Sequence, residues 1–141
     1  VAGVLILVLQ IWFLANWFED RSSLETSLVQ EMAQDELMKL RRVQLRFHEE
    51  NGRYGKFSEL DFNPIYGRYT LYLDHDDFIE ARNENGVVQH SLPFEFVPMV
   101  RAESFRAVAV NNFDDDSELD IWVIEESGRL VHEVDDLQLT P

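Results

Sequence analysis

Residues 44–60 read "QLRFHEENGRYGKFSEL", and within this stretch a long helical pattern comes to an abrupt end. Between Arg21 and Glu50 the chain contains neither glycine nor proline, and residues that favour helix predominate. Asn51 and Gly52 then supply the residue types that tolerate the left-handed backbone conformation in which helices commonly terminate. The sequence therefore predicts one long helix that stops at Asn51–Gly52.

Apolar side chains recur along this helix at helical spacing. The first set keeps an i, i+4 interval and consists of Leu24, Leu28 and Met32. The second set continues the face at intervals of three and four and consists of the apolar Leu37, Leu40 and Phe47 together with the polar Gln44. Because the first half is polar on its other sides, we expect it to stand free or to touch a partner. The second half carries enough apolar side chains to pack on a domain of the same chain, and a coiled coil is not indicated over so short a repeat.

The first eighteen residues, "VAGVLILVLQIWFLANWF", contain no charged side chain. As a helix they would span about 27 Å, just short of the roughly 30 Å hydrocarbon core of a bilayer, and we expect upstream residues to complete the span. Tryptophan and phenylalanine gather toward the carboxyl end of this run, where aromatic rings favour the membrane interface, and the charged Glu19-Asp20-Arg21 follows at once. The sequence predicts a transmembrane anchor at residues 1–18.

A secretory signal peptide is the alternative interpretation of this run. Such peptides usually have a shorter hydrophobic core that ends in small residues before a cleavage site. Here the run ends in "NWFED", which has no small-x-small step. The anchor is therefore preferred, and the single nearby cation, Arg21, favours an outward-facing domain under the positive-inside rule.

Composition limits the function classes. A chain of 141 residues has room for one compact domain and one appendage. The formal net charge is −15 and all of it lies after residue 18, so nucleic acid is not an expected partner. The absence of cysteine excludes disulfides, thiolate nucleophiles and thiolate metal ligands, but leaves the compartment undecided.

The carboxyl half reads as β structure. "RYTLYLD" at residues 68–74 alternates in the manner of a half-buried strand, and a polar loop with Asn83-Glu84-Asn85-Gly86 follows. "SLPFEFVPMV" at residues 91–100 suggests an edge strand or a packed loop. Three later runs are separated by short gaps that favour an antiparallel meander: "FRAVAVNNF", "LDIWVIEE" and "LVHEV". The expected fold is α+β, with a long amino-terminal helix, transmembrane and then amphipathic, packed on a small antiparallel sheet.

Two stretches carry a resemblance to a known family. A hydrophobic helix that continues into "LRRVQLRFHEENGRYGKFSEL" resembles the type IV pilins and pseudopilins of bacteria, in which the helix ends in an E-N-G-x-Y turn before a globular sheet. "AVAVNNFDDDSELDIWVIEESGRL" is similar to the carboxyl ends of pilin-like proteins. The resemblance implies an anchor at residues 1–18, a helix at 19–50 that enters the soluble part, and a pilin-like sheet domain at 51–141.

One departure from the family bears on function. Pilins that polymerise carry a glutamate very near the mature amino terminus, but alignment of the Glu-Asn-Gly turns places Ala2 near that position, and no acid precedes Glu19. We therefore predict a non-enzymatic accessory subunit of the bacterial inner membrane. It is single-pass, has its domain on the periplasmic side, and docks on the subunits of a larger secretion, respiratory or photosynthetic complex. A filament-forming pilin or pseudopilin is the alternative.

The acidic stretch "NNFDDDSELD" is the densest chemical feature of the sequence. Alternating oxygen ligands at Asp114, Asp116 and Glu118 suit a hard cation such as Ca²⁺, and some pseudopilins bind Ca²⁺ near this end. The stretch does not match an EF-hand, because Ser117 occupies the position that needs glycine. A calcium-binding sensor domain is thus a second alternative function, and a solvated acidic turn is the alternative interpretation of the stretch itself.

Catalytic and cofactor sites are not expected. The four histidines are scattered without metal-ligand spacing, and no serine has the surroundings of a nucleophile elbow. Within the apolar run, Gln10 is the amide at mid-helix, and Trp12 and Trp17 offer large flat surfaces nearby. Because rare polar side chains and packing give specificity in a bilayer, we predict these three residues as contacts with a partner subunit, with anchoring of the tryptophans at the interface as the alternative.

Overall fold

The computed structural model describes residues 2–64, 67–113 and 119–135, apart from the side chains of residues 2–6 and 16–23. The chain divides into two compact units, Val1–Glu31 and Met32–Pro141. The described residues form one helix, α1 (Ala2–Asn51), and eight strands. The strands are β1 (Thr70–Asp74), β2 (Asp77–Ile79), β3 (Ala81–Asn83), β4 (Gly86–Val88), β5 (Met99–Val100), β6 (Phe105–Asn111), β7 (Asp120–Glu125) and β8 (Leu130–Val134).

The first unit is helical throughout its described residues, as predicted. Nine consecutive side chains, at residues 7–15, are described before the next gap, and all nine are exposed. Among the described residues, no helix reaches the length and apolar character that a membrane crossing requires. Much of the predicted anchor at residues 1–18, namely the side chains of 1–6 and 16–18, lies outside the described residues.

The helix ends where the sequence predicts. Gly52 has a φ of 73°, the left-handed conformation that a residue with a side chain rarely adopts. Its N–H donates to the carbonyl oxygen of His48 at 2.7 Å, and the Asn51 side chain donates to the carbonyl oxygen of Phe47 at 3.0 Å. Two carbonyls of the last turn thereby receive donors, which closes the helix end.

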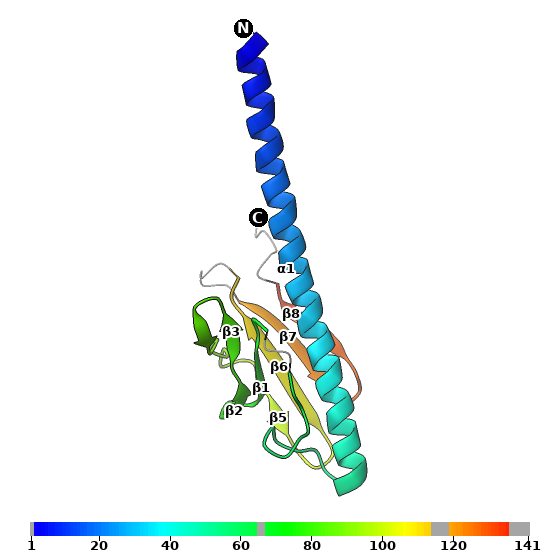
Figure 1. The fold of residues 1–141 in the computed structure, drawn as a ribbon. Coiled ribbons are helices and arrows are strands. Elements are labelled where there is room, and N and C mark those ends of the chain that lie inside the picture. Colours follow the sequence, from blue (N-terminus) through cyan, green and yellow to red (C-terminus); the bar gives the residue numbers. More distant parts are fainter. Residues whose placement is uncertain (1, 65–66, 114–118, 136–141) are drawn as a thin grey trace. The chain divides into compact units, whose positions relative to one another are not determined.

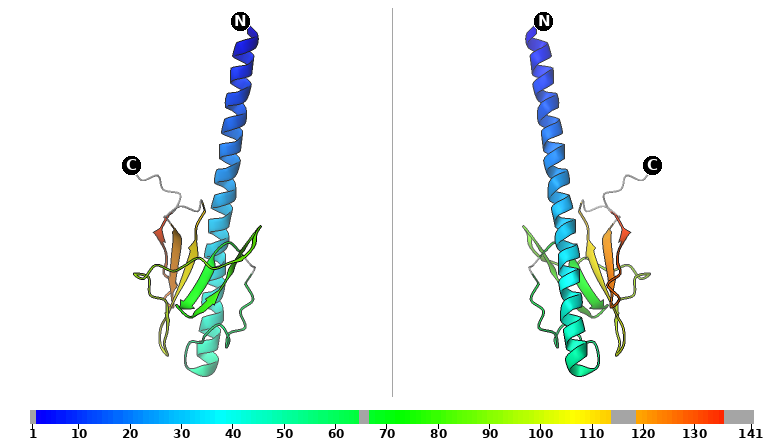
Figure 2. Two further views of the ribbon diagram at one scale, coloured as in Figure 1. Left: turned by 90° about the vertical axis from the view of Figure 1, so that its left-hand side faces the viewer. Right: turned by 90° about the vertical axis from the view of Figure 1, so that its right-hand side faces the viewer.

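The part of α1 that belongs to the second unit lies along one face of the sheet (Figures 1 and 2). The predicted inward face of this helix is confirmed, because Leu37, Leu40 and the polar Gln44 are completely buried and Phe47 is half-buried. Arg41 fixes the helix to the far hairpin, since its Nε donates to the carbonyl oxygen of Glu126 at 3.0 Å. The hairpin comes close enough that a Cβ on Gly128 would lie 3.1 Å from the Arg41 guanidinium carbon.

Gln44 joins the helix to the chain that follows it. Its Nε2 donates to the carbonyl oxygen of Gly55 at 2.8 Å, while its Oε1 accepts from the Gly55 N–H at 2.9 Å. This reciprocal pair imitates a backbone ladder, so the buried amide has both of its polar atoms satisfied. A Cβ on Gly55 would lie 2.9 Å from the Phe47 ring, which explains a glycine at this point. The E-N-G-x-Y-G turn is therefore fixed at its start by the hydrogen bond from Gly52 to His48 and at its end by the pair between Gln44 and Gly55.

The main sheet is antiparallel and has the order β2-β1-β6-β7-β8, with β5 pairing the other end of β6 beside β1. The predicted meander is confirmed: β6 pairs β7 from Arg106↔Glu125 to Asn111↔Asp120, and β7 pairs β8. A separate two-stranded sheet is formed by β3 and β4. The polar stretch predicted as a loop is thus a hairpin, in which Asn83 pairs with Gly86.

Both faces of the sheet are covered over much of its area, which the sequence did not predict. The prediction of a half-buried strand at residues 68–74 is wrong, since Thr70–Leu73 are all buried. One face packs on α1, and the other carries a second cluster around Tyr72, Val108 and Val123, against which Leu92 and Phe96 pack. Residues 91–100 therefore form a packed loop that ends in the short edge strand β5, so both predicted alternatives hold in part.

Candidate functional site

The residues predicted as sites have different outcomes. Gln10 and Trp12 are exposed on the helix, and Trp12 retains 64% of its surface. The side chain of Trp17 lies outside the described residues. The predicted calcium ligands Asp114, Asp116 and Glu118 also lie outside the described residues, so calcium binding at these positions stays a prediction.

The described residues bring together a different group, which we call the Asp120 cluster. It consists of Tyr69, Asp120, Trp122, His132 and Asp135. Tyr69 precedes β1, Asp120 and Trp122 lie on β7, His132 lies on β8 and Asp135 follows that strand. Alternate residues of a strand share a face, so Asp120 and Trp122 point away from Ile121 and Val123. The pairing of Trp122 with His132 then places the histidine on the same face.

Asp120 is a fully buried carboxylate with donors on both oxygens. The Tyr69 hydroxyl and the Trp122 Nε1–H donate to its Oδ2, the latter at 3.1 Å. Its Oδ1 lies 2.7 Å from His132 Nε2. A buried carboxylate is costly unless it is hydrogen-bonded, and both oxygens of Asp120 face a donor group of a neighbouring side chain.

Tyr69 is held in its neutral form. Burial raises the pKa of its phenol well above the ordinary range, and the hydrogen bond to Asp120 raises it further, because the phenol donates to a carboxylate that would repel a phenolate. Phe113 adds an edge-on ring contact, with centroids 6.2 Å apart. Tyr69 therefore serves as a fixed donor at any pH in the physiological range.

His132 is oriented from two directions. Its ring stacks on the Trp122 indole with centroids 3.8 Å apart and an angle of 6° between the planes. One ring nitrogen, Nε2, faces Asp120, and the other, Nδ1, lies 3.8 Å from Asp135 Oδ2. Both nitrogens thus face carboxylates rather than a nucleophile. The arrangement suits the holding of a proton or a metal ion, and the absence of enzyme activity stays a prediction.

Sequence reasoning did not find this cluster. The spacing of the histidines along the chain does not indicate a site, because His132 reaches Asp120 across a hairpin that separates them by twelve positions. Tyr69 is farther still, 51 positions from Asp120. The available signal was a charged residue inside an otherwise apolar strand, "LDIWVI", because a buried aspartate requires donors from its neighbours.

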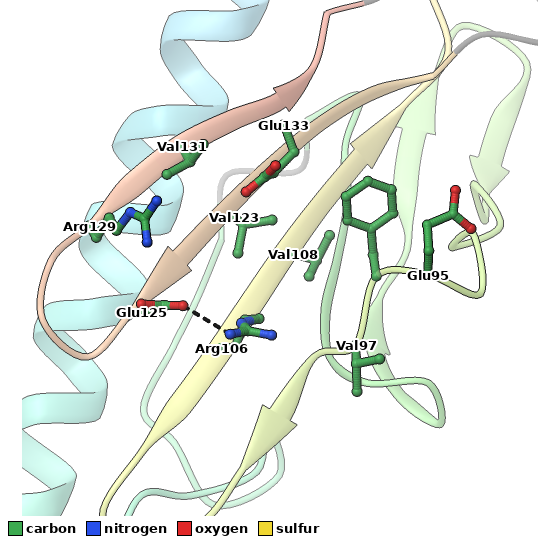
Figure 3. Close-up of a pocket in the computed structure, with 10 residues that line it drawn as sticks. Glu95, Val97, Arg106, Val108, Val123, Glu125, Arg129, Val131 and Glu133 are labelled. Carbon is green, nitrogen blue, oxygen red and sulfur yellow. Dashed lines mark hydrogen bonds and ion pairs between the residues drawn. The ribbon is translucent and has the colours of Figure 1, made fainter.

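A groove lies on the other face of the sheet (Figure 3). Its floor consists of Val108, Val123 and Val131, one from each of β6, β7 and β8. The loop at Glu95–Val97 lines one side, and Arg106 donates to Glu125 at 3.0 Å at one end. Its volume of about 290 Å³ is at the lower limit for small-molecule sites, so the groove suits a side chain of a partner better than a whole ligand.

No protein-family model, curated protein or solved structure matches this chain. The case for a function therefore rests on the residues themselves.

Proposed function

We propose that the chain is a non-enzymatic, single-pass membrane-anchored accessory subunit. Its pilin-like domain lies on the periplasmic side of a bacterial inner membrane and docks on a larger complex. One observation carries the proposal: the described apolar side chains between residues 7 and 14 are exposed. Between 53% and 68% of the surface of each of these is exposed: Leu7, Val8, Leu9, Ile11, Trp12, Phe13 and Leu14.

The distribution of these side chains suggests what covers them. Residues 7–14 are consecutive, so they point to every side of the helix rather than along one stripe. A helix that is apolar all round requires an apolar environment on all sides, as a bilayer or the middle of a helical bundle provides. We infer that lipid surrounds this part of the chain.

The next part of the helix differs. Leu24, Leu28 and Met32 expose 64%, 56% and 45% of their surfaces, and their i, i+4 spacing aligns them on one side. A single apolar stripe suits a protein partner that approaches from one direction. We infer that this stripe contacts another subunit close to the membrane surface.

The negative charge of the domain supports its placement outside the membrane. The net charge of −15 belongs entirely to residues after Phe18, so the domain is repelled by anionic headgroups and remains in water. Its long helix on an antiparallel sheet is also the architecture that the pilin resemblance implies. The larger complex is of the secretion, respiratory or photosynthetic class.

Membrane fractionation tests the anchor. We expect Leu9→Lys combined with Phe13→Lys to release the chain from membranes into an alkaline carbonate wash, because each lysine costs about 2.5–3.5 kcal/mol at the centre of a spanning helix. The control is Val87→Lys combined with Phe94→Lys, which changes two apolar side chains of the domain that are 56% and 92% exposed. Equal retention of both variants would contradict the anchor.

Native electrophoresis in a mild detergent tests the docking. We expect the parent chain to migrate with a larger assembly, and Leu24→Lys combined with Leu28→Lys to reduce that fraction without loss of the folded domain. We also expect Gln10→Leu combined with Trp17→Ala to lower co-purification with that assembly. Migration as a lone monomer would contradict the proposal, and a ladder of multiples of this chain would support the filament alternative.

A further inference from the structure

We propose that His132 and Asp135 bind a divalent transition-metal ion such as Zn²⁺, with Asp120 as the positioning residue that orients the histidine. The proposal is independent of the membrane anchor and of the calcium ligands predicted at residues 114–118. It rests on three observations: the donors around Asp120, the gap between His132 and Asp135, and the stack that fixes the imidazole.

The first observation determines which nitrogen of His132 carries hydrogen. An ionised carboxylate only accepts hydrogen bonds. Asp120 Oδ1 lies 2.7 Å from His132 Nε2, so the imidazole must donate its Nε2–H to Asp120. In the neutral ring the other nitrogen, Nδ1, then carries a bare lone pair, which is the form of histidine that binds metals.

The second observation concerns what Nδ1 faces. Asp135 Oδ2 lies 3.8 Å away, and it also presents lone pairs. That distance is too long for a hydrogen bond, and two facing lone pairs are unfavourable without a cation between them. Ligands about 2.0–2.2 Å from a tetrahedral Zn²⁺ lie about 3.4 Å apart, so an ion fits after these groups close by a few tenths of an ångström.

The third observation is that groups outside the ligand pair hold this geometry in advance. Histidine ligands of metals usually donate their second ring nitrogen to a carboxylate, which fixes the tautomer and the orientation of the ring. Asp120 has this position, and it is itself held by the Tyr69 hydroxyl and the Trp122 indole. The stack of His132 on Trp122, with centroids 3.8 Å apart, prevents rotation of the ring.

The ligand types select the class of ion. One imidazole nitrogen with carboxylate oxygen suits Zn²⁺, Cu²⁺ or Ni²⁺ better than Ca²⁺ or Mg²⁺, which prefer oxygen alone. His132 and Asp135 expose 21% and 24% of their side chains, so an ion can reach them from solvent and keep water as its remaining ligands. The strongly negative chain also favours the approach of cations.

A proton is the competing occupant, since a protonated His132 between two carboxylates would satisfy the same groups. Titration calorimetry of the full chain in detergent with ZnCl₂ at pH 7.5 separates the two. We expect saturable binding of one ion per chain, weakened at least about tenfold by Asp135→Asn. The matched control is Glu133→Gln, which removes the same charge from the next residue but one, on the other face of β8, where it lines the groove of Figure 3. We expect this variant to bind as the parent does.

A second readout reports the location of the ion. The chain has three tryptophans, so Trp12→Phe combined with Trp17→Phe leaves Trp122 alone. Because the indole stacks directly on His132, Cu²⁺ bound at Nδ1 should quench its fluorescence with a saturating dependence on concentration, and added EDTA should restore it. The quench should be lost in His132→Phe, which keeps an aromatic ring at the stack. Absence of Zn²⁺ heat, or affinity and quenching that are unchanged by Asp135→Asn, would overturn the proposal in favour of a proton-only cluster with adventitious ions elsewhere.

Discussion

The two units of this chain differ in which side chains they bury. In the first unit, large apolar side chains are exposed at residues 7–14 and at Leu24 and Leu28, whereas the second unit buries even some polar side chains. Gln44 and Asp120 are both completely buried, and both have partners on every oxygen. The exposed apolar side chains of the first unit have no cover from the described residues of this chain. The buried polar side chains of the second unit find their hydrogen-bond partners within the same domain.

The same difference is visible within a single helix. Leu28 and Leu40 are both leucines of α1 on apolar faces with helical spacing, but Leu28 exposes 56% of its surface and Leu40 none. Periodicity alone does not distinguish a face that packs on its own domain from one that awaits another molecule. The contrast can be tested one position at a time.

The largest effect is expected from the core. Leu40→Ala should lower the free energy of unfolding of the domain by about 2–5 kcal/mol, because it removes buried methyl groups and leaves a cavity. Leu28→Ala, the same substitution at an exposed position, should stay within about 0.5 kcal/mol. Urea unfolding of both variants in the same detergent measures the difference. Equal losses would mean that Leu28 is covered by the chain's own domain, and the contrast between the units would fail.

The next effect concerns the join between helix and sheet. Gln44→Leu should cost about 2–4 kcal/mol, because the N–H and the carbonyl oxygen of Gly55 would both be left buried without their partners. Gln34→Leu, at a half-buried position of the same helix, should cost less than half as much. If the two losses were similar, the reciprocal pair would contribute no more than ordinary packing.

Local signals accounted for the backbone of the fold. The helix end was predictable because Asn51-Gly52 is a conformational signal that acts through φ alone, and Gly52 has the expected φ of 73°. The strands β6, β7 and β8 were predictable because each is a β-rich run bounded by turn residues. The hairpin β3–β4 was missed because its strands have only three residues each, too few to show an alternation.

Long-range contacts were not predictable in the same way. Residues 68–74 alternate like a half-buried strand, and side chains distant in the sequence, among them Leu92 and Phe96, pack on the outer face and bury it as well. The Asp120 cluster assembles side chains from three separate stretches of the chain, at residues 69, 120–122 and 132–135, and no local spacing encodes that. A buried charge in an apolar strand signals that donors must exist, but not which residues supply them.

A smaller effect is expected at the second buried polar group. Tyr69→Phe should cost about 1–2 kcal/mol at pH 7, because Asp120 loses one of its donors while the ring remains. The pH dependence should change as well. The raised pKa of Tyr69 means that an unfolded tyrosine releases its proton at about pH 10 while the folded one retains it. This contribution to stability is full below about pH 10 and is lost as pH rises further.

Urea midpoints of the parent and of Tyr69→Phe between pH 7 and pH 11 measure both parts of this prediction. The parent should lose stability above about pH 10 more steeply than the variant, since the parent carries one more buried phenol than the variant, in addition to Tyr54 and Tyr72, which both proteins share. Parallel curves would indicate that the Tyr69 hydroxyl is accessible to water in the folded domain. The second unit would then not bury this polar group away from solvent.

The smallest effect is expected on the surface of the second unit, where polar groups are paired but not buried. Arg53 donates to Glu59 through Nη1 at 3.1 Å and Nη2 at 2.5 Å, and its guanidinium lies 5.2 Å from the Phe47 ring centroid. The hydrogen bonds from Arg53 lower the pKa of Glu59 to about 2, with a further contribution from the Lys56 N–H. A depressed carboxyl pKa contributes stability above the unfolded value of about 4.3, and that contribution is lost as pH falls toward 2.

We therefore expect Arg53→Met to return the Glu59 pKa toward its ordinary value in a carboxyl NMR titration, while the urea midpoint at pH 7 changes little. The change is small because the two side chains keep 49% and 33% of their surfaces in contact with solvent, which screens the pair. Raised ionic strength should weaken the depression of the Glu59 pKa more in the parent than in the variant, which retains only the charge of Lys56 among the cations that lower it. A loss of stability comparable to that of Gln44→Leu would contradict this expectation. It would show that the exposed Arg53–Glu59 pair stabilises the domain as much as the buried hydrogen bonds between Gln44 and Gly55 do.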